Sequence, residues 1–312
     1  MPQTWLTRCG LICIAFSLNA TTLAAALPPV QPVPVSPRVI ALLGPMALPN
    51  AQNQGYMVNA TLILGNSGAI LVDTGFTDEI GAHLARAVAR LTDKPVTTLV
   101  NTHHHGDHSF GNAAFPGATV ISSETCRKLL LDGEAAWKQM IETLVGRKFP
   151  NTRAVPASVV HANRSRTEVV IDGVRIVFWV PEWAHTAGDM MLWLPDEKVL
   201  IAGDVLVNQI TPNFRDAKVK LWIDTLAEVK EMPARTFIPG HGLLMNAAEV
   251  GAMHARMARL YAGVAAGYQA GLTDSEIRQK LDLDEWRPLH HFDEQMGGNI
   301  NKTYLEVEAA MF

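Results

Sequence analysis

The segment 102–108, Thr-His-His-His-Gly-Asp-His, places four histidines and one aspartate within seven residues. Imidazole nitrogens and carboxylate oxygens are typical ligands of zinc and other borderline metals. Because alternate side chains of an extended segment point the same way, His103 and His105 can bind one ion while Asp107 and His108 turn toward a second. The segment therefore predicts a site for two metal ions.

The sequence before this cluster indicates where the site lies. Residues 96–100, Val-Thr-Thr-Leu-Val, form a β-branched, apolar run typical of a buried strand, so the cluster begins where that strand ends. Ligand sites of α/β sheets lie at such carboxyl ends. A solvated tract that binds metal adventitiously is the alternative for a histidine-rich segment, and this context argues against it.

Two metal ions need more than four protein ligands, so further ligands are expected downstream. His185, Asp204 and His241 each lie at or just after the end of an apolar run with the composition of a strand. These three side chains are therefore the candidates that complete the site.

The order and context of these residues resemble those of the metallo-β-lactamase-fold hydrolases. That family carries an H-x-H-x-D-H segment, a histidine in an H-T-x-G-D context, an aspartate after an apolar strand and a G-H-G segment, preceded by L-V-D-T-G. This chain has all five elements in that order, and the resemblance covers residues 55–245. The elements stand at residues 103–108, 185–189, 204, 240–242 and, ahead of these, 71–75.

The resemblance implies two zinc ions per chain and assigns a role to each residue. The first ion would be bound by His103, His105 and His185, and the second by Asp107, His108 and His241. Asp204 would bridge the two ions. Asp73 would lie near the metals and fix the tautomer of a ligand imidazole, with an ordinary turn residue before Gly75 as the alternative. His104, between two ligands, is expected to point away from the metals.

The same resemblance implies a hydrolase in which a hydroxide bridging the zinc ions attacks a carbonyl group. The expected substrate is a small molecule with an ester, thioester, lactone or amide carbonyl. Asp107 or Asp204 could pass a proton to the leaving group, although a carboxylate beside a metal is a weak base.

Three other functions stay open on such a scaffold. A periplasmic β-lactamase is the first, but the true β-lactamases of this fold carry cysteine or serine where this chain has Asp204. A mononuclear-iron persulfide dioxygenase is the second, because that branch keeps most of these ligands. A metal-binding accessory protein of a periplasmic redox system is the third, since the chain is similar to exported proteins found with sulfur-oxidation and quinoprotein systems.

The balance of charge argues against a nucleic-acid partner. Lysine and arginine together number 26 against 30 aspartates and glutamates, and the chain contains no basic run. An enzyme that cleaves RNA or DNA usually needs a positive track for the phosphates. We therefore expect no nucleic-acid substrate.

Residues 1–26 have the pattern of a secretory signal peptide. One positive charge precedes a largely apolar stretch at residues 9–18, and the small residues at 23–26 offer a cleavage site. The apolar stretch is too short to span a bilayer, so no stable membrane span is expected after cleavage. We expect a periplasmic or secreted protein, with an uncleaved anchor as the alternative.

The rest of the chain divides into three parts. Five prolines within residues 27–38 predict an extended, poorly packed linker. Residues 39–246 would form the catalytic domain. Residues 247–312 would form a helical C-terminal extension, because apolar side chains recur there at helical spacing.

The pattern within the catalytic domain predicts an α/β fold. Two mixed sheets facing each other with helices outside, the αββα four-layer sandwich of the metallo-β-lactamase fold, fit the order of elements. Strands are expected at 61–64, 69–72, 96–100, 118–122, 168–180, 190–194 and 198–203, and helices at 77–91, 125–145 and 221–232.

Several aromatic and apolar side chains are candidates for a substrate pocket. For Trp137, Met140 and Leu144, which repeat at helical spacing, core packing is the preferred interpretation and a substrate lid is the alternative. Trp183 is a candidate for the pocket wall, with ordinary burial as the alternative. The histidine pair at 290–291 is expected on the surface, with a loop near a pocket as the alternative.

Overall fold

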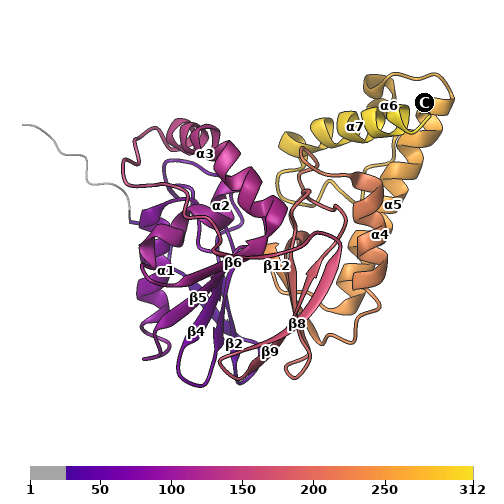
Figure 1. Cartoon of the computed structure of the whole chain (residues 1–312). Coiled ribbons are helices and arrows are strands. Elements are labelled where there is room, and N and C mark those ends of the chain that lie inside the picture. The colour runs from indigo at the N-terminus through magenta and orange to yellow at the C-terminus, as the bar shows by residue number, and fades with distance from the viewer. Residues whose placement is uncertain (1–25, 312) are drawn as a thin grey trace, which may run out of the picture.

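Two facing β-sheets with helices on their outer surfaces make up the centre of the molecule (Figure 1). The structure is a computed structural model that describes residues 26–311, so the predicted signal peptide lies, but for its last residue, outside the described residues. Among residues 26–311, seven strands form one sheet and five form the other. The predicted α/β class, with helices outside two mixed sheets, is confirmed.

The seven-stranded sheet runs in the order β1-β2-β3-β4-β5-β6-β7. It is antiparallel from β1 to β4 and parallel from β4 to β7. Its strands are β1 (Gln31–Pro34), β2 (Val39–Leu43), β3 (Ala60–Leu64), β4 (Ala69–Val72), β5 (Val96–Val100), β6 (Thr119–Ser123) and β7 (Val159–His161).

The five-stranded sheet runs in the order β12-β11-β10-β9-β8, and only its β11–β12 pair is parallel. Its strands are β8 (Ser165–Ile171), β9 (Val174–Val180), β10 (Met191–Leu194), β11 (Val199–Val207) and β12 (Thr236–His241). Apolar side chains from both sheets form one shared core, with Val72 and Val100 from the first sheet and Phe178 and Ile201 from the second. This core holds the strands that carry the candidate ligands in fixed positions.

Helices cover both outer faces of the sandwich. They are α1 (Asp78–Val88), α2 (Gly106–Ser109), the 3-10 helix η1 (Phe110–Ala114), α3 (Glu124–Val145), α4 (Val219–Val229), α5 (Ala247–Gln269), α6 (Asp274–Lys280) and α7 (Phe292–Ala309). In Figure 1, α1 and α3 lie beside the seven-stranded sheet and α4 and α5 beside the five-stranded sheet. The hydroxyl of Thr77 caps α1 by accepting from the Ile80 N–H, while Leu84 and Val88 lie on the buried face.

The segment 168–180, predicted as one strand, is the hairpin β8–β9. Asp172 and Gly173 form its turn, with φ of +47° and +78°. A two-residue turn with positive φ at both positions favours an Asp-Gly pair, and this pair interrupts the apolar run. The sequence prediction was therefore wrong only in missing the turn signal inside a continuous β-prone stretch.

The proline-rich segment is extended, as expected, but part of it pairs with the sheet. β1 pairs antiparallel with β2, and Pro32 lies opposite Leu42 in that register. Proline is tolerated in an edge strand because one side of such a strand makes no ladder hydrogen bonds. The sheet therefore begins at Gln31, ahead of the start expected at Val39.

The C-terminal helices share the core of the five-stranded sheet. α5 buries Val250, Met253, Met257, Leu260 and Val264 in one cluster with side chains of β11 and α4. The boundary placed after residue 246 thus falls within a continuous apolar core. Among the residues that the structure describes, no helix is both long and apolar enough to cross a membrane.

Candidate metal centre

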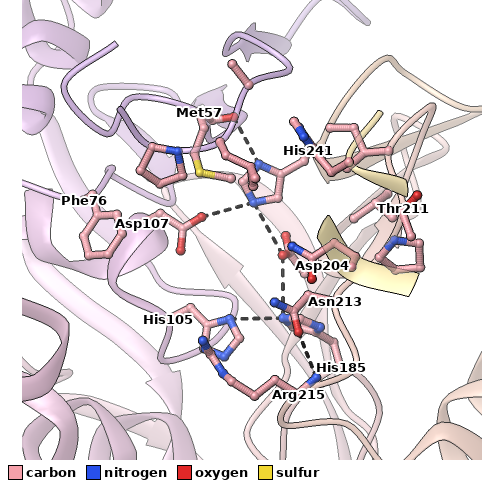
Figure 2. Close-up of a pocket in the computed structure, with 18 of the residues that line it drawn as sticks. Met57, Phe76, His105, Asp107, His185, Asp204, Thr211, Asn213, Arg215 and His241 are labelled. Atoms are coloured by element: carbon pink, nitrogen blue, oxygen red, sulfur yellow. Dashed lines mark hydrogen bonds and ion pairs between the residues drawn. The ribbon is translucent and has the colours of Figure 1, made fainter. Parts of the chain in front are cut away.

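The structure brings the seven side chains predicted as metal ligands into one cluster, of which Figure 2 labels five. The histidine segment follows β5 directly, and His185 lies in the loop after β9. His241 is the last residue of β12. Asp204 lies within β11 beside Gly203, where φ is +51° and the register with β12 shifts, so an irregularity in the strand presents this carboxylate.

The first group of ligands consists of His103, His105 and His185, which are all buried. One ligand nitrogen from each lies within 4.8 Å of the other two. His185 Nε2 is 3.1 Å from His105 Nδ1. His103 Nε2 is buried and has no hydrogen-bond partner within residues 26–311. These are the three residues expected to hold the first ion.

The second group consists of Asp107, His108 and His241, again with ligand atoms within 4.8 Å of one another. His108 Nε2 is 3.3 Å from His241 Nε2 and 3.4 Å from an oxygen of Asp107. The same Asp107 oxygen is 3.1 Å from His241 Nε2. These are the three residues expected to hold the second ion.

Asp204 lies between the two groups. Its Oδ2 is 3.6 Å from His185 Nε2 in the first group and 3.4 Å from His241 Nε2 in the second. Its Oδ1 is 3.3 Å from His108 Nε2. One carboxylate thus reaches nitrogens of both groups, which is the position that a bridging ligand requires.

Asp73 and Thr102 orient the ligand nitrogens of His108 and His103. Asp73 accepts a hydrogen bond of 2.8 Å from His108 Nδ1 and others from the Thr102 backbone N–H and hydroxyl. Because the single hydroxyl hydrogen of Thr102 goes to Asp73, the hydroxyl oxygen accepts from His103 Nδ1 at 3.1 Å. Both imidazoles therefore keep the lone pair of Nε2 for a ligand, and Asp73, at φ +58°, is also a turn residue.

A second carboxylate, which the sequence did not reveal, plays the same part for His105. His105 Nε2 donates to Asp216 at 2.8 Å, so its Nδ1 carries the lone pair that faces His185. Asp216 also accepts from Arg215 Nε at 3.1 Å. Trp183 donates from Nε1 to the Asp216 carbonyl at 2.9 Å and thus supports the loop that carries this carboxylate.

Backbone completes the set for His241, whose Nδ1 lies 3.0 Å from the carbonyl of Met57. A carbonyl can only accept, so Nδ1 carries the hydrogen and Nε2 faces Asp107 and Asp204 with its lone pair. His185 differs, because its Nδ1 is buried without a hydrogen-bond partner in the described part of the chain.

The donor set fits metal ions. His185 Nε2 lies 3.1 Å from the lone pair of His105 Nδ1, and the Nε2 atoms of His108 and His241 lie 3.3 Å apart. Nitrogens at such distances share either a hydrogen or a cation. Imidazole nitrogens with carboxylates around two centres are ligands that zinc prefers.

The charges in the cluster also favour cations. Burial alone would raise the pKa of Asp107 and Asp204, but the nearby His108 and His241 outweigh it and hold both pKa values well below the usual range. Burial lowers the pKa of His185 to about 3, so this imidazole is neutral at pH 7. Burial would also lower the pKa of His108 and His241, but the nearby carboxylates outweigh it and raise the pKa of His241 to about 10 and that of His108 well above its usual value. These two imidazoles therefore take up protons in the absence of a metal, and a metal cation would replace those protons.

His104 belongs to neither of the two predicted groups. Its ring lies edge-on to Trp137, with 6.3 Å between ring centroids, and burial lowers its pKa to about 3. Ligand atoms of His104, His105 and Asp216 also lie within 4.8 Å of one another, and His104 Nδ1 is buried without a hydrogen-bond partner in the described part of the chain. The expectation that His104 points away from the metals therefore stays a prediction.

A cavity of about 200 Å³ adjoins the cluster, and five of the seven candidate ligands line it. In Figure 2, Met57 and Phe76 lie on one side of these ligands, and Thr211 lies on the other. The apolar wall includes Pro45, Leu48, Pro49, Met57, Phe76, Trp137, Met140 and Leu144, and the other wall includes Ile210, Thr211, Pro212, Asn213, Arg215, His291 and Gln295.

The pocket corrects three expectations about its walls. Trp137 and Met140 pack against the core, as preferred, but both also line the cavity together with Leu144, so core packing covers only part of their role. Trp183 lines a separate hollow, so its assignment to this wall was wrong. His291, expected on the surface, lines the pocket because the start of α7 meets the loop after β11.

Comparisons with known proteins agree with this geometry. The family model for the metallo-β-lactamase superfamily matches residues 53–241. A linear primary-alkylsulfatase of Pseudomonas sp. is 24% identical over 264 residues, which are 71% of this chain and 49% of that protein. A metallo-β-lactamase type 2 of Bacteroides fragilis is 29% identical over 189 residues, 59% of this chain and 68% of that protein. The chain thus spans about half the length of the alkylsulfatase.

Solved structures show the same fold. The stereoselective inverting sec-alkylsulfatase from Pseudomonas sp. superimposes with a TM-score of 0.65 at 19% identity, covering 88% of this chain and 50% of that one. A metallo-β-lactamase from Pontibacter korlensis gives a TM-score of 0.59 at 20% identity, covering 73% of this chain and 98% of that one. Since the family model matches more than half of a chain whose fold and His/Asp cluster agree with it, the protein belongs to the metallo-β-lactamase superfamily.

Proposed function

We propose that the protein is a dinuclear zinc hydrolase that cleaves an ester, thioester, lactone or amide bond of a small molecule. The observation that carries this proposal is the arrangement of the imidazoles. His103, His105, His108 and His241 each have one nitrogen fixed by an acceptor and turn the other toward the cluster. Such tautomer control supports metal binding because it presents lone pairs rather than N–H groups.

The candidate ligands and their hydrogen-bond partners would have different functions in the reaction. Two zinc ions would supply a water molecule acidified toward neutrality and a Lewis acid that polarises the scissile bond. His103, His105 and His185 would hold one ion, Asp107, His108 and His241 the other, and Asp204 both. Asp73 and Asp216 act one step further out, by fixing His108 and His105.

Proton transfer to the leaving group falls to Asp107 or Asp204. Both carboxylates line the cavity, and each side chain keeps about a tenth of its surface exposed. The low pKa of each makes it a weak base, so we expect a modest contribution from this step. Apolar side chains such as Phe76 and Met140 limit the access of bulk water to the same space.

A sulfate ester is the second candidate substrate. The alkylsulfatase structure covers 88% of this chain, whereas the Pontibacter β-lactamase covers 73%. The apolar wall of the cavity would also accept a linear alkyl chain. This candidate keeps the same metal ligands and changes the bond that is broken: attack at the alkyl carbon, as the inverting stereochemistry of the alkylsulfatase implies, would cleave the C–O bond and release sulfate.

The proposal is tested by measuring metal content and turnover of the same zinc-loaded preparation. Elemental mass spectrometry should find about two zinc ions per chain. Hydrolysis is then assayed on a lactone, a thioester, a chromogenic β-lactam and a linear alkyl sulfate. Turnover of the lactone or thioester supports the main proposal, and turnover of the sulfate alone supports the second candidate.

Three results would point to the other functions. Turnover of the β-lactam alone would identify a β-lactamase. One iron per chain with oxygen consumption on a persulfide would identify a dioxygenase. Bound metal without turnover of any of these substrates would support an accessory metal-binding protein.

We also propose that the protein is exported to the periplasm or secreted. The charge and hydropathy pattern of residues 1–26 supports this, together with the cluster of small residues before position 27. Mass spectrometry of the protein recovered from a periplasmic or culture-medium fraction should find a chain that begins at Leu27. A full-length chain in the membrane fraction would show an uncleaved anchor instead.

A further inference from the structure

Two polar atoms in the cavity wall opposite Met57 and Phe76 lack partners. Thr211 Oγ1 and His291 Nε2 are buried, and neither has a hydrogen-bond partner within residues 26–311. Both residues line the cavity beside the metal ligands, and the Thr211 residue is only 2% exposed. A buried polar atom without a partner costs stability, so two of them in one ligand pocket point to a partner that arrives with the ligand.

The backbone holds this wall in place. The Thr211 N–H donates to the His290 carbonyl at 2.9 Å, and the His290 N–H donates to the Gln209 carbonyl at 2.9 Å. The side chain of Asn299 accepts from the Phe214 N–H at 2.9 Å. These bonds join the loop after β11 to α7 and to the residue before His291, so the backbone that carries Thr211 and His291 is held in place beside the cavity.

His291 itself has an unusual backbone. It precedes α7 with φ of +64°, in the left-handed region that histidine adopts more readily than most residues. Burial lowers the pKa of its imidazole, which is therefore neutral at pH 7. A neutral imidazole and a hydroxyl both donate or accept hydrogen bonds, and neither attracts an ion strongly.

The two walls of the cavity differ in polarity. Apolar side chains of Met57, Phe76 and Met140 face the ligands from the N-terminal half of the chain. Thr211 and His291 line the cavity from the C-terminal half, and Figure 2 shows Thr211 on the side away from Met57 and Phe76. A substrate held over the metal ligands would therefore meet apolar surface on one side of its scissile bond and, at Thr211 and His291, neutral hydrogen-bonding groups on the other. Arg215 lines the same side, but its guanidinium is paired with the Asp216 carboxylate at 3.1 Å.

We infer that Thr211 and His291 form a subsite for an uncharged hydrogen-bonding group of the substrate. The substrates are then amphiphilic molecules, with an amide, carbonyl or hydroxyl group on one side of the scissile bond and an apolar group on the other. This inference rests on the proposed hydrolase function. An amide suits the subsite best, because it offers both a donor and an acceptor.

The test compares carboxylates that differ only in an amide. N-Acetyl-β-alanine matches hexanoate in chain length, and N-acetylglycine matches pentanoate, while the carboxylate of each can bind the metals. Dissociation constants are measured by calorimetry on the zinc-loaded full chain, which needs no turnover. Loss of hydrolysis alone would then count against the proposed function, whereas the ratio of the two constants reports on the subsite.

The key variant is Thr211→Val, which replaces the hydroxyl with a methyl group of similar size. In the wild type we expect the acetylated ligand of at least one pair to bind more tightly than its alkyl partner. That preference should fall about three- to tenfold in Thr211→Val, as expected for one neutral hydrogen bond. His291→Asn, which keeps a residue suited to left-handed backbone, should reduce the same preference.

Thr152→Val is the matched control. Thr152 is also buried, but its hydroxyl donates to Asp78 at 2.5 Å and accepts from the Asp78 N–H at 3.3 Å, and it does not line the cavity. Thr152→Val should lower the melting temperature and leave the ligand preference unchanged. Thr211→Val should leave the melting temperature of the ligand-free protein unchanged or raise it, since it removes an unpaired hydroxyl.

Three results would overturn the inference. The first is an equal affinity for both members of each pair in the wild type, or no binding of any acetylated ligand. The second is an amide preference that survives in both Thr211→Val and His291→Asn. The third is a fall in melting temperature in Thr211→Val as large as in Thr152→Val, which would show that the hydroxyl has a partner within the protein.

Discussion

At the scale of single residues, each candidate metal ligand depends on the hydrogen-bond partner that orients its ring. Asp73 holds His108 in the second group, and Asp216 holds His105 in the first, each at 2.8 Å. A carboxylate in this position fixes the tautomer and the ring orientation and makes the ligand nitrogen more basic. The two groups of ligands thus have one supporting carboxylate each, although these come from distant parts of the chain.

Replacing the carboxylate of Asp73 or Asp216 should weaken the binding of one zinc ion more than that of the other. Asp216→Asn is expected to lower the affinity of the first group, and Asp73→Asn that of the second, each by about 10- to 100-fold. Competition with a chromogenic chelator, followed by elemental analysis, measures both affinities. Asp224→Asn, at an exposed carboxylate paired with Lys220, is the control and should change neither. Unchanged binding of both ions in Asp216→Asn would contradict the role given to that residue.

Asp204 and His104 make a second matched pair. Asp204 lies within 3.6 Å of nitrogens from both ligand groups, so Asp204→Ala should reduce zinc content and turnover by orders of magnitude. His104 lies against Trp137 instead, so His104→Ala should keep two zinc ions. Elemental analysis and initial rates decide the matter. Near wild-type turnover in Asp204→Ala would remove the bridging role, and loss of zinc in His104→Ala would make that residue a ligand.

The thiol of Cys126 should be inert in the native protein. Burial raises its pKa to about 12, although its place in the first turn of α3 would by itself favour the thiolate. Its labelling by a maleimide should therefore stay slow from pH 7 to pH 9 and become fast in denaturant. Peptide mapping follows Cys126 separately from Cys9 and Cys13. Fast labelling of native protein that rises through pH 8–9 would show an accessible thiol.

The sequence predicted the seven candidate metal ligands because they belong to short motifs at strand ends. Asp216, in contrast, reaches His105 across 111 residues of separation and belongs to no local pattern. Thr211 also belongs to no local pattern, and for His291 the sequence offered a place near a pocket only as an alternative. Only the folded chain shows that Thr211 Oγ1 and His291 Nε2 lack hydrogen-bond partners within residues 26–311. Local motifs thus identify the candidate metal ligands, whereas the supporting and pocket-lining groups depend on tertiary contacts.

At the scale of elements, α3 serves two purposes. The Ser123 hydroxyl caps its start, and Gly146, with φ of +78°, ends it. One face buries Leu130 and Ile141 in the core, while Trp137 and Met140 reach the cavity. Helical periodicity predicted the helix, but it could not divide the apolar face between core and pocket because both positions favour the same side chains.

Trp137 should govern how the cavity holds apolar groups. The centroid of its ring lies 6.0 Å from that of Phe76 and 5.1 Å from Cζ of Arg215, so Trp137 joins the two walls. Trp137→Ala should raise KM for apolar esters about tenfold or more and leave the zinc content unchanged. Leu131→Ala, an exposed position on the same helix, is the control. An unchanged KM would show that α3 merely packs beside the site.

At the scale of the whole molecule, the C-terminal helices belong to the structure that carries the site. α5 covers α4 and the five-stranded sheet, and the Glu306 carboxylate in α7 accepts hydrogen bonds from the Val219 and Lys220 N–H groups at the start of α4. In Figure 1, α7 lies toward the same end of the sandwich as α3. The sequence predicted helices here, and it offered contact with a pocket only as the alternative for the histidine pair at 290–291.

Truncation after residue 246 should therefore unfold the remaining domain rather than leave it folded. Five apolar side chains of α5 would be lost from the core, each worth about 1.5–3 kcal/mol of burial. Their sum is comparable to the whole stability of a domain, about 5–15 kcal/mol. Near-ultraviolet circular dichroism and dye binding should show loss of fixed packing. A soluble, cooperatively folding fragment that binds two zinc ions would contradict this expectation.

The β-bridge between Ile210, in the loop after β11, and His290, just before α7, joins two segments that are synthesised at different times. The ribosome completes the histidine segment after about a third of the 312 residues, yet the wall that contains Thr211 is held by residues near the end of the chain. Chains emerge from the N-terminus first, so metal-binding groups exist long before the cavity is closed. We therefore expect the growing chain to be able to bind metal before it can select a substrate.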